Sequence, residues 1–113
     1  MPRGRPERSV IRDNIISLLY YLNIGYGYDL AKIYNEIFPE VTQRSIYYHL
    51  RKGVETGEIS IHRIEQEKGN FSWGNMVEKT YYALGENAQP KIDERIASYL
   101  TQKNEIKLLF KGL

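Results

Sequence analysis

The sequence predicts a fold of the α+β class, mainly α-helical with a small β-hairpin, and three observations lead to this prediction. Three segments in the first half repeat apolar residues at the spacing of an amphipathic helix. The next stretch changes to isoleucines and tyrosines in two runs, with turn signals between them. A final segment returns to helical spacing. A chain of 113 residues fits one domain with a modest core.

The first two helices are predicted from their caps and apolar faces. One helix runs from Ser9, whose hydroxyl can cap it, to Leu22. A second covers residues 28–38, and its apolar face is formed by Leu30, Ile33, Tyr34, Ile37 and Phe38. The glycine-rich segment 23–27 is predicted to be the short connection between these helices.

A third helix carries the candidate binding surface. Pro39 cannot continue the preceding helix, and Thr42 is placed to cap the next one. Ile46, Leu50 and Val54 would face the core, so the opposite front is free to reach phosphates or base edges. The candidate contact residues on this front are Thr42, Gln43, Arg44, Ser45, Tyr48, Arg51 and Lys52. The alternative is an ordinary amphipathic surface helix, whose outer face is also charged.

A β-hairpin follows the third helix. Gly57 is a helix-end signal, and strands are predicted over residues 58–64 and 77–84. The tip between them contains the candidate contact residues Lys68 and Asn70. It also contains Phe71 and Trp73, which we expect to pack against their own domain or a dimer partner. The alternative is that these two side chains line an effector pocket. Helix, turn, helix and a long-tipped hairpin form a winged helix-turn-helix, predicted here over residues 9–86.

The sequence also resembles the PadR-like winged-helix transcriptional regulators. The matching segments are GYDL at residues 27–30, VTQRSIYYHL at 41–50, VETG at 54–57 and KTYYAL at 79–84. The resemblance implies that the third helix enters the major groove, that the wing touches the DNA backbone, and that Tyr47 is structural. Gly53 departs from the family pattern, which has a large apolar residue there. A glycine inside a helix costs about 1 kcal/mol relative to alanine, so we expect a kink or an early end.

Residues 1–8 form a basic arm that we expect to be flexible. Its core, Arg3-Gly4-Arg5 between two prolines, resembles an AT-hook. Arginines of this kind bind narrow minor grooves, where the negative potential is concentrated. The alternative is a solubilising tail.

The last segment, residues 88–113, is predicted to be a C-terminal dimerisation helix. Its apolar stripe contains Ile92, Ile96, Tyr99, Ile106 and Phe110. Ile16 and Tyr20 lie off the main stripe of the first helix and would complete the dimer face. These residues predict a homodimer, as the resemblance also implies. The alternative is that the helix folds back on its own domain.

Composition narrows the classes of function. The chain has no cysteine, and His49 and His62 are its only histidines, so we expect no metal site, no cofactor and no enzyme. Ten tyrosines suggest base stacking, but core or core-edge positions are predicted for Tyr28, Tyr34, Tyr47 and one or both of Tyr81 and Tyr82. No signal peptide or membrane span is evident, which predicts a cytoplasmic protein.

The function that these patterns predict is sequence-specific binding of double-stranded DNA by a transcriptional regulator. Its net charge is only +2, but basic residues are concentrated in the arm and the third helix. Two alternatives remain open: a winged-helix protein-interaction module within a larger assembly, and an RNA-binding module.

Overall fold

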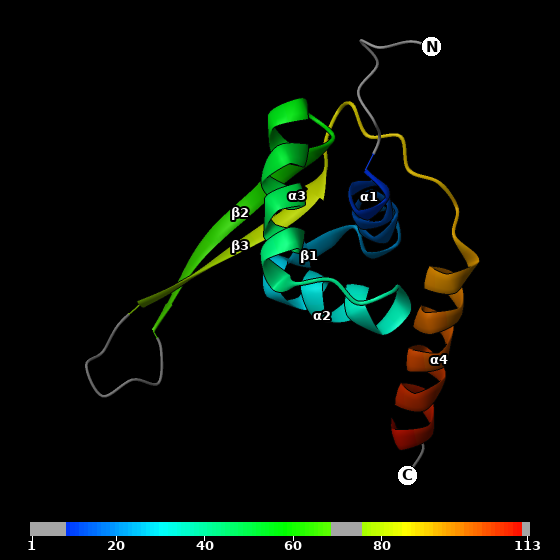
Figure 1. Ribbon diagram of the computed structural model, residues 1–113. Coiled ribbons are helices and arrows are strands. Elements are labelled where there is room, and N and C mark those ends of the chain that lie inside the picture. Colours follow the sequence, from blue (N-terminus) through cyan, green and yellow to red (C-terminus); the bar gives the residue numbers. More distant parts are fainter. Residues whose placement is uncertain (1–8, 69–75, 112–113) are drawn as a thin grey trace, which may run out of the picture.

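The computed structural model describes residues 9–68 and 76–111, which form an α+β fold with a small antiparallel sheet. The elements in chain order are α1 (Val10–Leu22), β1 (Ile24–Tyr26), α2 (Gly27–Ile37), α3 (Gln43–Thr56), β2 (Ile59–Lys68), β3 (Met76–Leu84) and α4 (Glu94–Lys111). The strand order in the sheet is β1-β3-β2. The β2–β3 hairpin extends away from the helices, and α4 lies on the other side of the molecule (Figure 1).

The helix ends follow the predicted capping residues. The Ser9 hydroxyl accepts a hydrogen bond from the Arg12 amide at 3.3 Å, and the Thr42 hydroxyl accepts one from the Ser45 amide at 3.1 Å. Each satisfies an amide that the first turn leaves without a helical partner. Gly57 ends α3 in the left-handed conformation, at φ 81°. Glycine adopts this conformation without strain, because it has no Cβ.

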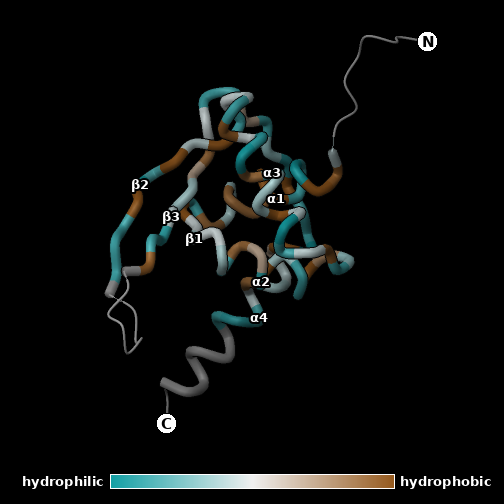
Figure 2. The backbone as a smooth tube through the Cα atoms, turned by 60° about the vertical axis from the view of Figure 1, so that its left-hand side comes forward, coloured by the Kyte–Doolittle hydropathy of each residue, from teal (hydrophilic) through white to brown (hydrophobic). Residues whose placement is uncertain are grey.

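The core lies where α1, α2, α3 and the sheet meet. Ile46 and Leu50 of α3 are fully buried, and Val54 packs against the core, as predicted. The predicted face of α2 is also confirmed, since Leu30, Tyr34 and Phe38 are buried. Figure 2 shows that the hydrophobic residues concentrate where the helices meet and that β2 carries hydrophobic stretches outside this region.

The segment predicted as a plain connection between α1 and α2 contains strand β1. Its residues Ile24, Gly25 and Tyr26 pair with Ala83, Tyr82 and Tyr81 of β3. A Cβ on Gly25 would lie 2.5 Å from Cδ2 of Leu30, so the glycine lets α2 pack closely on this strand. The prediction missed β1 because its partner strand is more than fifty residues away in the sequence.

The first strand of the hairpin is longer than predicted. β2 continues past Ile64 to Lys68, with a register shift between Ile61 and Arg63. Polar side chains pair along this extension: Lys79 of β3 lies 3.1 Å from the Glu67 carboxylate. Cross-strand pairs of this kind stabilise a hairpin without burial in a core, so the apolar pattern could not place the strand end.

The expected kink at Gly53 is absent, because α3 continues regularly to Thr56. Gly53 is buried, and Ile59 at the start of β2 packs directly against it. A Cβ on Gly53 would lie 2.5 Å from Cδ1 of Ile59. The glycine therefore allows a close contact between the helix and the sheet.

The position of the C-terminal helix shows that part of the predicted dimer face is buried within the protomer. α4 begins at Glu94, so Ile92 precedes it, and the Ile92 side chain is 81% exposed. Ile96 is 0% exposed and, like Ile16 of α1, belongs to the core of this chain. Both residues are used inside the protomer because α4 packs against α1 and α2. Their assignment to a dimer face was therefore wrong, and this part of the helix follows the fold-back alternative.

Polar contacts hold α4 in this position. The Tyr99 hydroxyl donates a hydrogen bond to Glu36 of α2 at 2.5 Å, and Lys103 lies 3.8 Å from the same carboxylate. Burial and this hydrogen bond raise the pKa of Tyr99 to about 12. Tyr20 remains exposed. Ile106 and Phe110 belong to α4, but their side chains lie outside what the structure describes.

Candidate nucleic-acid interface

Most of the predicted contact residues lie on the solvent face of α3. Thr42, Gln43, Arg44, Tyr48 and Arg51 are exposed, and Ser45 and Lys52 are partly exposed. The buried side of the same helix carries Ile46 and Leu50. The helix therefore exposes polar and basic side chains on the side opposite its buried face, as the sequence predicted.

The Asn35 side chain, which the sequence analysis did not identify, fixes the start of α3. The Asn35 amide group donates to the Val41 carbonyl at 3.1 Å and accepts from the Val41 amide at 2.9 Å. These two bonds tie the end of α2 to the residue before the Thr42 cap. Asn35 thereby fixes the path of the turn into α3. The only sequence signal was an asparagine near a helix end.

Arg44 and Arg51 on the α3 surface have no acidic partner within the described ranges, whereas the neighbouring Lys52 has one. Among the residues that the structure describes, Arg44 and Arg51 make no ion pair and no side-chain hydrogen bond. Lys52 is paired, because its ammonium lies 3.4 Å from the Glu55 carboxylate. This pair is exposed, and such pairs contribute about 0–1 kcal/mol, so a stronger anion could replace Glu55. Arg44 and Arg51 can bind an anion without first breaking such a pair.

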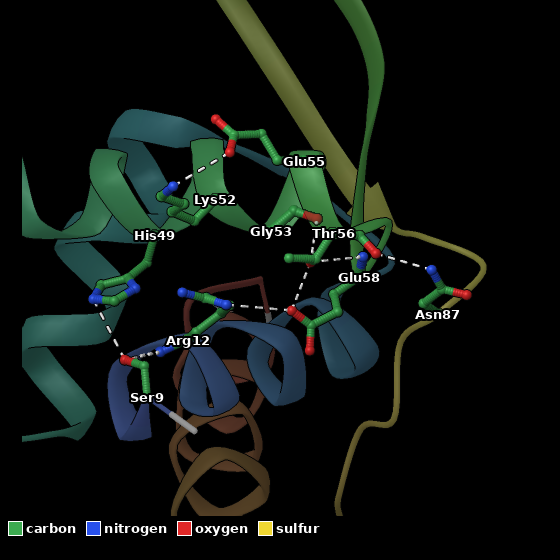
Figure 3. A network of polar contacts seen from close by, with 9 residues as sticks. All are labelled: Ser9, Arg12, His49, Lys52, Gly53, Glu55, Thr56, Glu58 and Asn87. Carbon is green, nitrogen blue, oxygen red and sulfur yellow. Dashed lines mark hydrogen bonds and ion pairs between the residues drawn. The ribbon is translucent and has the colours of Figure 1, made fainter. Parts of the chain in front are cut away.

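A polar network connects α3 to the start of α1 (Figure 3). His49 of α3 points toward Ser9 at the start of α1, and its Nε2 lies 3.4 Å from the Ser9 hydroxyl. Arg12 reaches between His49 and Glu58, and its guanidinium lies 3.6 Å from the Glu58 carboxylate. Within the described part of the chain, Arg12 Nε and His49 Nδ1 are buried without a hydrogen-bond partner. The sequence pattern did not reveal this network, since its members are up to 49 residues apart.

The network sets the charge state of His49. Burial, and then the nearby positive charge of Arg12, lower the pKa of His49 below its ordinary value of 6.5. Both effects disfavour the imidazolium form. His49 is therefore a neutral side chain that joins two helices, which agrees with its omission from the predicted contact set.

The described part of the hairpin has balanced charge. Arg63 pairs with Glu65 at 2.6 Å, Lys79 pairs with Glu67, and Gln66 donates to Glu78 at 3.4 Å. Lys68 is the last residue of β2, but its side chain lies outside the description. The same is true of the whole of residues 69–75, which include Asn70, Phe71 and Trp73, and of Arg3, Gly4 and Arg5 in the arm.

The tyrosines divide between core and surface, with one correction. Tyr34 is buried and Tyr47 packs against the core, as predicted, while Tyr48 is exposed. Tyr28 was predicted at a core position, but its side chain is 47% exposed. It lies beside Tyr26 of β1, with a centroid distance of 6.2 Å.

Comparisons with protein-family models and with curated proteins give no match to this chain. In the described ranges 9–68 and 76–111, no three histidine or carboxylate side chains are grouped as a metal ion would require. No helix in these ranges combines the length and the apolar content needed to cross a bilayer.

Proposed function

We propose that this protein is a winged-helix transcriptional regulator that binds double-stranded DNA with α3 in the major groove. The single observation that carries the proposal is the exposed face of α3, where Arg44 and Arg51 stand without acidic partners among the described residues. Phosphates supply the complementary charge, and Gln43, Arg44 and Ser45 occupy the first turn, where base contacts of recognition helices concentrate.

The fold supports this proposal. α2, the turn at Pro39 and α3 have the order of a helix-turn-helix, and the β2–β3 hairpin follows them as a wing would. Strand β1 pairs with β3 and so anchors the hairpin to the helices. In this arrangement the balanced charges of the described wing contribute little to phosphate binding, and α3 supplies most of it. The arm, with Arg3 and Arg5, is proposed to add minor-groove contacts.

We also propose a homodimer, but with a contact surface that differs from the one predicted from the sequence. Ile16 and Ile96 are used inside the protomer, so a partner would contact the exposed Tyr20 and Ile92 instead. Sedimentation at micromolar concentration tests this, and a monomer there would exclude the dimer.

The central experiment measures affinity for duplex DNA of random sequence across a salt series. We expect log affinity to fall linearly with log salt, because each phosphate neutralised releases counterions. Arg51→Ala should make the slope shallower by about 0.9, the value expected when one phosphate is no longer neutralised. Lys91→Ala removes the same charge from the segment before α4 and is the matched control. No binding, or equal slopes for all three proteins, would overturn the proposal.

A second candidate is a protein-interaction module, favoured by the exposed isoleucines of β2. Ile61 and Ile64 are 48% and 51% exposed on a hairpin whose described charges are balanced. Such a module would show weak, nonspecific duplex binding. The RNA-binding alternative would show tighter binding to structured RNA than to duplex DNA in the same salt series.

A further inference from the structure

A pocket of about 360 Å³ lies between α2, β1 and the base of the β2–β3 hairpin. Its floor is apolar and is formed by Leu22, Leu30 and Ile33. Tyr26 of β1 and Tyr81 of β3 also line it, with ring centroids 5.7 Å apart. A volume of a few hundred Å³, apolar lining and a few polar groups are typical of small-molecule sites. This pocket is separate from the exposed face of α3.

The charges around the pocket favour a cation. Asp29, in the first turn of α2, is exposed at the pocket and makes no ion pair or side-chain hydrogen bond in the described part of the chain. Arg63 also lines the pocket, but its charge is neutralised by Glu65 at 2.6 Å. Lys79, 5.0 Å above the Tyr26 ring, is likewise paired with Glu67. Among the described residues around the pocket, the remaining charge is the carboxylate of Asp29.

An anion would bind less well at the same place. It would meet the negative charge of Asp29, and it would have to compete with Glu65 for Arg63. A neutral ring would fill the apolar floor but leave that carboxylate without a counterion. An ammonium group attached to an aromatic ring satisfies both features, because the ring covers the apolar lining and the ammonium pairs with Asp29. The tyrosine rings themselves already face cations of the protein, with Arg63 4.1 Å from the Tyr81 centroid and Lys79 5.0 Å from the Tyr26 centroid.

We propose that this pocket binds a small aromatic amine, with its ring on Leu30 and Ile33 and its ammonium group beside Asp29. The ligand would contact α2 and the base of the hairpin together, and would therefore restrict the angle between them. An effect of the ligand on DNA binding rests on the proposed function, but binding of the ligand does not.

Tryptamine, which is a cation, is a suitable probe. Indole-3-propionate has the same ring with a negative charge, and indole is the uncharged comparison compound. In titrations of the ¹⁵N-labelled full chain, we expect tryptamine to shift the amide signals of Gly25, Asp29 and Leu30. Its affinity should exceed that of indole-3-propionate by about tenfold or more, since opposite charges in contact near a protein surface differ from like charges by more than about 1.4 kcal/mol. Equal affinities for the three probes, or shifts confined to other residues, would overturn the proposal.

Two variants and one control locate the site. Asp29→Asn should reduce tryptamine affinity to that of indole, while Glu40→Gln, which removes an exposed carboxylate from the turn before α3, should not change it. Ile24→Trp should fill the pocket mouth and weaken all three probes. Thermal unfolding of each variant checks the fold. Unchanged tryptamine binding by Asp29→Asn would overturn the proposal. So would shifts of the same amides on diluting the protein alone, which would identify a second copy as the occupant.

A final measurement separates this site from the DNA proposal. Duplex affinity is compared with and without tryptamine for the wild type and for Asp29→Asn. A change restricted to the wild type supports coupling between pocket and hairpin, and no change with the pocket saturated overturns the coupling. Absence of duplex binding by either protein contradicts the proposed function but leaves the pocket result valid.

Discussion

Gly53 of α3 and Ile59 of β2 are packed so closely that a Cβ on Gly53 would lie 2.5 Å from Cδ1 of Ile59. Ile59 is 1% exposed and belongs to the hydrophobic core. This contact fixes the distance between α3 and the base of the hairpin. It also explains why a glycine is tolerated inside a helix that ends normally at Thr56.

The first prediction tests this contact. Gly53→Ala should lower the free energy of unfolding by about 1 kcal/mol, because overpacking costs about 1–3 kcal/mol and exceeds the gain of about 1 kcal/mol in helix propensity. In an Ile59→Ala background the same change should be neutral or stabilising, because the methyl group enters the space left by the isoleucine. Denaturant unfolding of the four proteins measures the coupling, and additive effects would contradict it.

The second prediction concerns α4. Ile96→Val should lower the free energy of unfolding by about 1 kcal/mol, as expected for a buried isoleucine. Ile92→Val should have almost no effect, since that side chain is exposed. The Ile96 contact lies within one chain, so its effect should not change with protein concentration. Unfolding measured at low and high concentration would reveal an interchain contact as an effect that varies.

The third prediction is a pH dependence due to His49. Its pKa is lowered in the folded state, so the unfolded chain takes up the proton first as the pH falls. Stability should be complete above the ordinary pKa of 6.5 and should decline below it, toward the lowered pKa of the folded state. His49→Gln should remove this decline. His62→Gln, at an exposed position on β2, is the matched control, and an equal change in both variants would argue against the role of His49.

The fourth prediction separates two functions on α3. Arg44→Ala should weaken binding and reduce the discrimination between a selected site and its single-base variants, by about 1–3 kcal/mol if the contact is bidentate. Arg51→Ala should weaken binding to all duplexes by a similar factor, because phosphate contacts carry no base identity. Competition binding with mutated sites distinguishes these outcomes. Equal effects of the two variants on every duplex would exclude base recognition by Arg44.

The fifth prediction concerns the arm. Deletion of residues 1–6 should leave the thermal midpoint nearly unchanged and should weaken binding most at sites flanked by A/T-rich sequence, where the minor groove is narrow. Measurements on matched A/T-flanked and G/C-flanked duplexes provide the comparison. Equal losses on both would mean that Arg3 and Arg5 act as a nonspecific electrostatic tail.

The local features of this protein follow from short stretches of its sequence. Ser9 and Thr42 cap helices because their hydroxyls accept amides of their own first turns, and Gly57 ends α3 because of its own backbone freedom. The apolar face of α3 follows from helical periodicity. Each of these depends on residues within a few positions of one another, so a pattern can predict it.

Other features require residues that are distant in the sequence and meet only when the helices and strands pack together. β1 exists because β3 pairs with it, Gly53 is accommodated because Ile59 packs there, and Arg12 meets His49 only after α1 packs against α3. Ile96 has the periodicity of a dimer stripe, yet it is buried in its own protomer. A spacing pattern shows which side chains must leave water, but the position of α4 against α1 and α2 determines which surface covers them.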